Sequence, residues 1–242
     1  MNIELFIPCF IDQLYPQTAF NTVKVLEKAG CTVNYNGDQT CCGQPAFNAG
    51  FWDEAKTVGS KFLSDFSGEN YIVSPSASCT GMVKNYYNEL FTNTIDHNKC
   101  RGIQGNIREL SDFLINVVKK DYFGAELEGK AVYHDSCAGL RECGIKAEPR
   151  QLLSKVHGLD LVEMKDGDMC CGFGGTFTVK FHGISSAMAE QKVQNAMEVE
   201  AEYIISTDAS CLLQLQGYID KHNIPMKTMH LADVLAHGWG NV

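Results

Sequence analysis

The segments Tyr71-Ile72-Val73-Ser74-Pro75-Ser76-Ala77-Ser78-Cys79 and Tyr203-Ile204-Ile205-Ser206-Thr207-Asp208-Ala209-Ser210-Cys211 decide the fold of this chain. Each begins with a short apolar run rich in β-branched residues, which is typical of a buried strand. Each then passes through Ala-Ser into a cysteine. Because the same strand-to-cysteine pattern occurs in both halves of the sequence, we interpret it as an internal duplication.

A second repeated motif lies upstream of these segments, as Cys41-Cys42-Gly43 in the first half and Cys170-Cys171-Gly172 in the second. A single cysteine precedes each motif by 31 and 32 intervening residues, and another follows it by 36 and 39. Four thiolates gathered from distant points of a chain are the usual ligands of an iron-sulfur cluster or a structural zinc. We therefore predict two metal sites, whose ligands are Cys9, Cys41, Cys42 and Cys79 in one and Cys137, Cys170, Cys171 and Cys211 in the other.

The elements around these motifs also correspond between the halves. Strands are expected at 3–8, 31–35 and 71–74 and again at 130–134, 159–164 and 203–206. Helices are expected at 18–29, 52–66 and 109–114 and again at 149–156, 185–202 and 230–235. This alternation predicts an α/β fold of two similar halves, each a small, mostly parallel sheet with flanking helices. The pattern loosens at 121–129, so the predicted domains are 1–125 and 126–242.

The outer cysteines of both sets, Cys9, Cys79, Cys137 and Cys211, each follow a predicted strand. In parallel α/β sheets, ligand-binding residues lie in the loops at the carboxyl ends of the strands. We therefore expect each thiol set to gather at the carboxyl edge of its own sheet.

The chemistry of the adjacent cysteines favours metal binding over disulfides. Consecutive Cα atoms lie about 3.8 Å apart, which is shorter than the roughly 4.4 to 6.8 Å of a relaxed disulfide. Zinc sites built from four cysteines usually use pairs separated by two to four residues, which are missing here, although zinc stays an alternative for one site. Iron-sulfur chemistry also gives glycines a role, because backbone N–H groups near sulfur raise the reduction potential. We predict that role for Gly43, Gly172, Gly174 and Gly175.

Several residues outside the two sets remain candidates with weaker signals. Cys31 and Cys100 are expected to pack without a ligand, and Cys143 either packs, approaches the second site or acts as a redox thiol. His134 and His182 are candidates for the surroundings of the second site. No dinucleotide-binding loop is present, because Phe177 stands where the third glycine of Gly-x-Gly-x-x-Gly would be. The catalytic residues, if any, are not indicated.

Composition narrows the possible partners. The chain has 242 residues and a formal net charge of −9, without a run rich in Lys or Arg, so a nucleic-acid partner is not expected. No basic segment precedes a long apolar run at the start, and no stretch of 18 or more apolar residues follows. We expect a cytoplasmic protein without a membrane span.

The segments Ile7-Pro8-Cys9-Phe10, Cys41 through Gly50, His134-Asp135-Ser136-Cys137 and Cys170 through Phe177 together resemble the CCG or cysteine-rich domain family. That family includes the cysteine-rich subunit of heterodisulfide reductase and the iron-sulfur subunits of glycolate oxidase and anaerobic glycerol-3-phosphate dehydrogenase. The likeness is narrower to the lactate-utilisation members, and it covers essentially the whole chain. In the wider family each module ends in Cys-x-x-Cys, whereas Met82 and Gln214 occupy the last position here.

The resemblance implies a function that composition and spacing do not show. It implies an oxidoreductase component with one iron-sulfur cluster per half, of the 4Fe-4S kind, that transfers electrons while a complex oxidises L-lactate to pyruvate. The implied partners are an iron-sulfur protein B and a protein C, and a 2-hydroxy acid through the complex. Three alternatives remain: an iron-sulfur subunit acting on another 2-hydroxy acid or on succinate, a thiol-disulfide reductase, and a metal-stabilised scaffold that docks partners.

Overall fold

The computed structural model describes residues 1–66 and 68–239, and it contains two four-stranded sheets in which all the paired strands are parallel. The first sheet has the order β2-β1-β3-β4 and the second the order β6-β5-β7-β8, so the two halves share one topology. The strands are β1 (Asn2–Leu5), β2 (Thr32–Tyr35), β3 (Tyr71–Ser74), β4 (Ile107–Glu109), β5 (Glu126–Tyr133), β6 (His157–Val162), β7 (Tyr203–Ser206) and β8 (Lys227–His230). The predicted fold class is confirmed.

Helices connect the strands in both halves. In the first half they are α1 (Cys9–Leu14), α2 (Pro16–Lys28), α3 (Gln44–Asn48), α4 (Trp52–Asp65), α5 (Ala77–Gly81), α6 (Tyr87–Phe91), α7 (His97–Asn106) and α8 (Leu110–Asp112), with π-helical turns at Met82–Tyr86 and Phe113–Val118. In the second half they are α9 (Ala147–Leu153), α10 (Thr176–Lys180), α11 (His182–Glu198), α12 (Ala209–Lys221) and α13 (Leu231–Leu235), with a π-helical turn at Ala138–Glu142.

The sequence-based boundaries were wrong at a few elements. The short edge strands β4 and β8 were missed, because their last residues, Glu109 and His230, were assigned to the helices that follow. Both residues instead precede those helices, and their side chains accept hydrogen bonds from the first helical N–H groups. Helix α11 also begins three residues earlier than predicted and ends at Glu198.

The two halves share one continuous hydrophobic core. Buried residues of the first half, such as Leu110 and Phe113, belong to the same apolar cluster as Leu152 and Leu231 of the second half. Helix α2 packs against α13, and α8 packs against α9. Because α2 of the first half corresponds to α9 of the second, and α8 corresponds to α13, the same contact joins the halves twice. The predicted domain boundary at 125/126 falls directly before β5 and stays a prediction. The last residues of the predicted second domain, 240–242, lie outside the described part of the chain.

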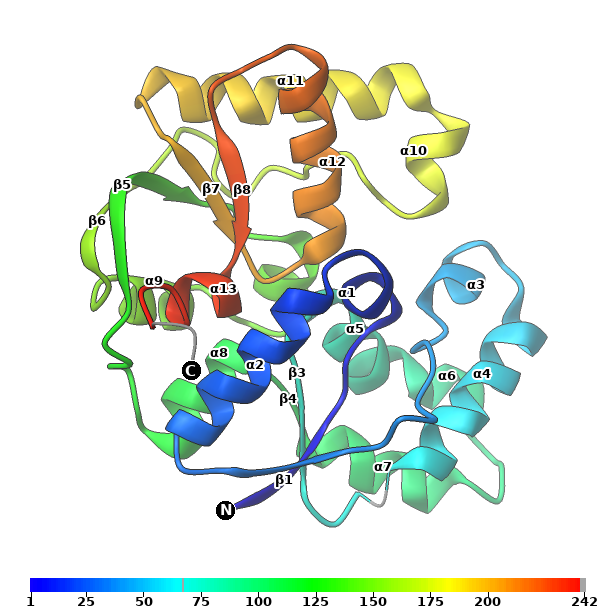
Figure 1. Ribbon diagram of the computed structural model, residues 1–242. Coiled ribbons are helices and arrows are strands. Elements are labelled where there is room, and N and C mark those ends of the chain that lie inside the picture. The colour runs from blue at the N-terminus through cyan, green and yellow to red at the C-terminus, as the bar shows by residue number, and fades with distance from the viewer. Residues whose placement is uncertain (67, 240–242) are drawn as a thin grey trace.

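The carboxyl ends of the two sheets face each other across the middle of the molecule (Figure 1). In each sheet the strand order changes direction between the two central strands, β1 and β3 in one and β5 and β7 in the other. Ligands of open α/β sheets bind in the crevice that opens at such a point. The fold thus directs both crevices toward a common centre.

Candidate metal centre

All eight cysteines of the two predicted sets line a single cavity of about 540 Å³ between the halves. Its volume is typical of pockets that hold small molecules or cofactors. Cys42 and Cys171 are buried, and the other six cysteines are partly exposed toward this space. The cysteines also remain free of disulfides throughout the described residues. Separate sites at each sheet were predicted, but a shared cavity was not.

The first quartet is assembled from three loops at the carboxyl edge of its sheet. Cys9 begins α1 with three residues between it and the end of β1, the adjacent cysteines lie between β2 and α3, and Cys79 is the third residue of α5. The Sγ atoms of Cys9 and Cys41 lie 3.8 Å apart. That separation is short enough for both thiols to reach one bound metal centre.

The second quartet repeats this arrangement. Cys137 follows β5, Cys170 and Cys171 lie in the long loop between β6 and α10, and Cys211 is the third residue of α12. Hydrogen bonds link the thiols of each quartet in the same order. In the first quartet they join Cys9 to Cys41, Cys41 to Cys42 and Cys42 to Cys79. In the second they join Cys137 to Cys170, Cys170 to Cys171 and Cys171 to Cys211. The same four sulfur positions are therefore built twice.

The glycine after each cysteine pair has a backbone conformation that requires glycine. Gly43 and Gly172 have φ angles of +85° and +88°. A Cβ on Gly43 would lie 3.1 Å from the carbonyl oxygen of Ala55, and one on Gly172 would lie 2.5 Å from that of Ser185. Each glycine N–H donates to the Sγ of the first cysteine of its pair, at 3.4 Å in both halves. Gly174 and Gly175 line the cavity before α10.

The crowding of thiols polarises each quartet. Hydrogen bonds from Cys42 and then Cys9 lower the pKa of Cys41 to about 3. Hydrogen bonds from Cys137 and then Cys171 lower the pKa of Cys170 to about 2. The pKa values of Cys42 and Cys171 are raised, first by their contact with these neighbours. One thiolate per half is thus available at neutral pH, and a bound cation would release the remaining protons.

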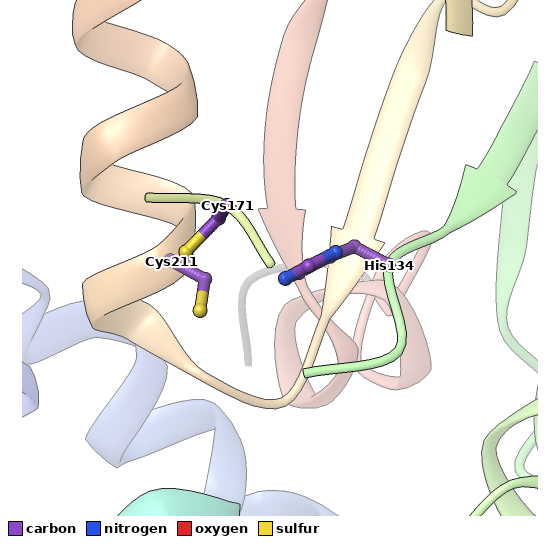
Figure 2. Close-up of side chains that lie close together, drawn as sticks. All are labelled: His134, Cys171 and Cys211. Atoms are coloured by element: carbon purple, nitrogen blue, oxygen red, sulfur yellow. The ribbon is translucent and has the colours of Figure 1, made fainter. Parts of the chain in front are cut away.

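His134 lies beside the second quartet, as Figure 2 shows. One ring nitrogen and the Sγ atoms of Cys171 and Cys211 all lie within 4.8 Å of one another. The imidazole is fully buried, and neither of its nitrogens has a hydrogen-bond partner among the described residues. Burial, together with the positive charge of Lys192, lowers its pKa to about 3, so the ring is neutral. A neutral imidazole is the form that binds a metal.

The other candidates lie away from the sulfur atoms. His182 is exposed at the start of α11, and Cys31 and Cys100 are buried in the core, as predicted for the cysteines. The Sγ of Cys143 lies 3.5 Å from the carbonyl oxygen of Ala77 in the first half, where burial raises its pKa. Its position at the junction of the halves fits the packing role.

The positions of the family's fifth cysteine carry no thiol here. Met82 is fully buried in the core of the first half. Gln214 donates to the hydroxyl of Ser185 at 2.8 Å and accepts from that of Thr178 at 3.2 Å. Met82 therefore packs in the cluster that contains Cys42, and Gln214 is held by two hydroxyl groups of its own half.

Polar residues that the sequence did not reveal join the halves beside the cavity. Asp208 directly precedes α12, but its Oδ1 accepts from the backbone N–H of Ser78 at 2.9 Å and from the hydroxyl of Ser76 at 3.1 Å. His230 of the second half contacts the carbonyl oxygen of Pro75 at 2.8 Å. When the two repeats are aligned, Asp208 takes the sequence position of Ser76. That difference between the repeats was the only sequence feature that pointed to Asp208.

An aromatic contact joins the halves at the cavity itself. The rings of Phe10 and Phe173 meet edge to face, with centroids 5.4 Å apart. Phe10 follows Cys9 of the first quartet, and Phe173 follows the cysteine-glycine turn of the second. This contact therefore joins the two segments that carry Cys9 and Cys171.

The residues fit an iron-sulfur or other thiolate-bound metal centre. The fit rests on two converging thiol quartets, one polarised thiol in each, and an orphaned buried imidazole at the second. In the part of the chain that the structure describes, no helix has the length and apolarity needed to cross a membrane.

Comparisons with known proteins identify the family of the chain. The model of the cysteine-rich domain (CCG) matches residues 3–84 and 131–216. The chain is 40% identical to "Lactate utilization protein A" of Anoxybacillus flavithermus over 98% of this chain and 100% of that protein. It is 39% identical to "Lactate utilization protein A 2" of Bacillus cereus strain AH820, over 98% of this chain and 99% of that protein.

A solved structure, glutamate racemase from Francisella tularensis, aligns with a TM-score of 0.39 at 11% identity, over 97% of this chain and 78% of that one. That likeness is too low to support an argument. The two matches to the family model and the near-complete curated relatives establish the family: the chain belongs to the CCG cysteine-rich domain family and, within it, to the lactate utilization A proteins.

Proposed function

We propose that this chain is an iron-sulfur electron-transfer subunit of a multi-subunit oxidoreductase that oxidises L-lactate to pyruvate. The relatives named for lactate utilisation support the substrate. The observation that carries the proposal is that two matching thiol quartets open into one cavity. The chain would work in the cytoplasm as a component of the complex and would not be active alone.

The eight cysteines would hold one 4Fe-4S cluster in each half. Such clusters, when bound, accept and release single electrons. Oxidation of a 2-hydroxy acid releases two electrons, so two centres facing one space allow the chain to take up both of them. The protein's contribution is to hold the thiolates in place, to exclude water with buried Cys42 and Cys171, and to keep the centres apart at a fixed spacing.

The glycines would tune the centres. The N–H groups of Gly43 and Gly172 already donate to sulfur, and such hydrogen bonds raise the reduction potential of a cluster. Gly174 and Gly175 lack side chains where the chain passes along the cavity, which lets the backbone approach a bound cluster closely.

The proposed partners are an iron-sulfur protein B and a protein C of the same lactate-utilisation complex. This part of the proposal rests on the names of the relatives, which identify the chain's counterpart as protein A. The cavity and its rim would receive electrons from one partner and deliver them to another.

Anaerobic reconstitution with iron and sulfide tests the cofactor. We expect the wild-type protein to bind iron and sulfide at two centres per chain. The variants Cys41→Ser/Cys42→Ser and Cys170→Ser/Cys171→Ser should each retain about half of the wild-type iron. Cys31→Ala is the matched control, because this buried cysteine opens the strand region at the opposite end of the sheet and should leave the iron content unchanged. Uptake of zinc without iron would contradict the proposal.

Turnover by the assembled complex tests the role in electron transfer. The chain is mixed with proteins B and C, and L-lactate-dependent reduction of an electron acceptor is measured. Variants lacking either centre should lose turnover while still co-purifying with both partners. Unchanged turnover in both variants would assign the chain a scaffold role, and turnover with glycolate or succinate but not lactate would assign another substrate.

A further inference from the structure

We propose that His134 is a protein ligand of the metal centre in the second half, and that the first half has no counterpart to it. This inference rests on the proposed function, because it names a further ligand of one of the two proposed centres. It makes the second centre chemically distinct from the first, although both have the same four thiols.

The repeats show which residue replaces His134 in the first half. The N–H of His134 donates to the carbonyl oxygen of Ile205 at 2.8 Å, and the N–H of Phe6 donates to that of Val73 at 2.9 Å. Strands β3 and β7 correspond in the duplication, and Val73 and Ile205 occupy the same position in them. Phe6 therefore lies at the position of His134, three residues before the first cysteine of its quartet.

The neighbouring helices differ at a matching position. Gly43 packs against Ala55 of α4 as Gly172 packs against Ser185 of α11, which aligns the two helices. Seven residues further on, Phe62 of the first half corresponds to Lys192 of the second. Phe6 and Phe62 meet edge to face with ring centroids 4.9 Å apart. The second half thus replaces a buried aromatic pair with a buried imidazole and a buried ammonium group.

Packing alone does not require this replacement. The fold accommodates two phenylalanines at the same positions in the first half, with more apolar surface buried and no polar atoms to satisfy. An unpaired buried polar group costs about 1 to 3 kcal/mol. His134 carries two such nitrogens among the described residues, so a bound group is expected to satisfy at least one of them.

Lys192 is also not needed merely to hold its loop. Its Nζ donates to the carbonyl oxygens of Asp166 and Gly167 at 2.6 and 3.0 Å. In the first half, Lys61 holds the corresponding loop through the carbonyl oxygen of Asp38 at 2.8 Å, from a side chain that is 42% exposed. The second half therefore uses a buried cation where a partly exposed lysine suffices in the first half. The positive charge of Lys192 lies close enough to Cys171 to offset the negative charge of its thiolate.

The surroundings of His134 identify the ligand class. Its nearest potential co-ligands are Cys171 and Cys211, whose sulfur atoms lie within 4.8 Å of a ring nitrogen (Figure 2). Sulfur and imidazole nitrogen together bind iron and zinc, and histidine replaces cysteine on one iron in some natural iron-sulfur centres. The geometry therefore points to a mixed nitrogen and sulfur centre in the second half and an all-sulfur centre in the first.

Pulsed electron paramagnetic resonance of the reconstituted, reduced protein tests this assignment. The Cys41→Ser/Cys42→Ser protein carries only the second centre, and it is prepared with ordinary histidine and with ¹⁵N-labelled histidine. We expect a histidine nitrogen coupling that changes with the isotope and is lost in His134→Phe. Two controls should behave differently: His182→Phe keeps the coupling, and the Cys170→Ser/Cys171→Ser protein, with the first centre alone, shows none.

The outcomes separate the two proposals. A second centre that contains iron and sulfide but shows no histidine nitrogen coupling overturns ligation by His134 and leaves the proposed function standing. A chain that assembles no iron centre overturns the proposed function itself. Because the isotope comparison uses the unsubstituted histidine, it stays decisive if His134→Phe does not fold. ⁵⁷Fe Mössbauer spectra provide a second readout, in which one distinct iron site should disappear in His134→Phe.

Discussion

The two halves of the molecule have the same strand order, the same four thiols and the same glycine turn, yet they differ directly behind the sulfur atoms. In the first half Phe6 packs on Phe62 and Phe66, with ring centroids 4.9 and 5.8 Å away. In the second half, His134 takes the place of Phe6 and Lys192 takes the place of Phe62. The backbone topology therefore determines where the thiols lie, and the residues behind them can change without disturbing those positions.

This comparison separates two functions of the buried residues. An apolar pair stabilises its half by packing, whereas a polar pair lowers stability unless it binds something. If the second half retains the polar pair for a bound metal, then exchanging residues between the halves should have opposite effects on stability. The predictions below test that expectation and related differences, beginning with the largest.

Phe6→His should reduce the free energy of unfolding of the metal-free protein by about 4 kcal/mol, because it removes buried aromatic packing and introduces an imidazole without a partner. The reciprocal change, His134→Phe, should leave that free energy unchanged or raise it. Urea denaturation followed by circular dichroism measures both variants. Equal losses for the two exchanges would show that His134 stabilises the metal-free fold, and the comparison would then fail.

Asp233→Ala should reduce the free energy of unfolding by about 3 kcal/mol, because charge-assisted hydrogen bonds contribute roughly 1.5 to 3 kcal/mol each. The carboxylate accepts from Thr18 at 2.7 Å and Asn21 at 2.9 Å, so it joins α13 to α2 of the other half. The matched control is Asp112→Ala.

Asp112 has the equivalent position in the first half, but it interacts within its own half. It accepts from Asn116 at 2.8 Å and lies 3.7 Å from Arg108. Such surface contacts contribute less than about 1 kcal/mol. Equal losses for Asp233→Ala and Asp112→Ala in urea denaturation would contradict a special role for Asp233 at the junction.

The duplicated topology was predictable because the repeated apolar strands and glycine-cysteine turns are local signals. The central strands β3 and β7, for example, are continuous buried runs between polar loops. The edge strands β4 and β8 were missed since Ile107-Arg108-Glu109 and Lys227-Thr228-Met229-His230 are short and carry polar residues. Their residues look like the first turn of the following helix.

The shared cavity and the role of Lys192 required the structure. The relative placement of the halves depends on contacts between residues more than 200 positions apart, such as Thr18 and Asp233, which no local pattern encodes. Lys192 lies among Glu190, Gln191 and Gln194, so in sequence it resembles the solvated face of a helix. Its burial and its correspondence with Phe62 are visible only in the structure.

Glu109→Gln should remove about 2 kcal/mol of pH dependence between pH 5 and pH 7. Glu109 accepts from the N–H of Ser111 at 2.7 Å, and burial raises its pKa from 4.5 to about 8. The native state therefore keeps a proton that the unfolded chain releases near pH 4.5. By linkage, the free energy of unfolding decreases as pH rises through this window and is greatest below it.

The second half provides the contrast, because His230 at the equivalent position accepts from the N–H of Ala232 at 3.1 Å with a ring nitrogen instead of a carboxyl oxygen. Urea denaturation of wild type and Glu109→Gln at pH 5, 6 and 7 measures the difference. Parallel pH profiles for the two proteins would show that Glu109 ionises normally in the native state.

Tyr87→Phe should produce the smallest effect, a loss of about 1 kcal/mol in the free energy of unfolding, because it removes one buried hydrogen bond. The Tyr87 hydroxyl donates to the carbonyl oxygen of Cys42 at 2.9 Å and so fixes the cysteine pair of the first half. Alignment of the repeats places Ile219, which has no hydroxyl, at the equivalent position of the second half. The loop that carries Cys42 therefore has a hydrogen bond to its backbone that the loop carrying Cys171 lacks.

In reconstituted protein, Tyr87→Phe should speed the removal of iron by a chelator from the first centre and leave the second centre unaffected. Proteins carrying one centre each make this measurement, with Tyr86→Phe as the neighbouring control. Equal acceleration at both centres would mean that the substitution loosens the whole fold and not the first cysteine pair.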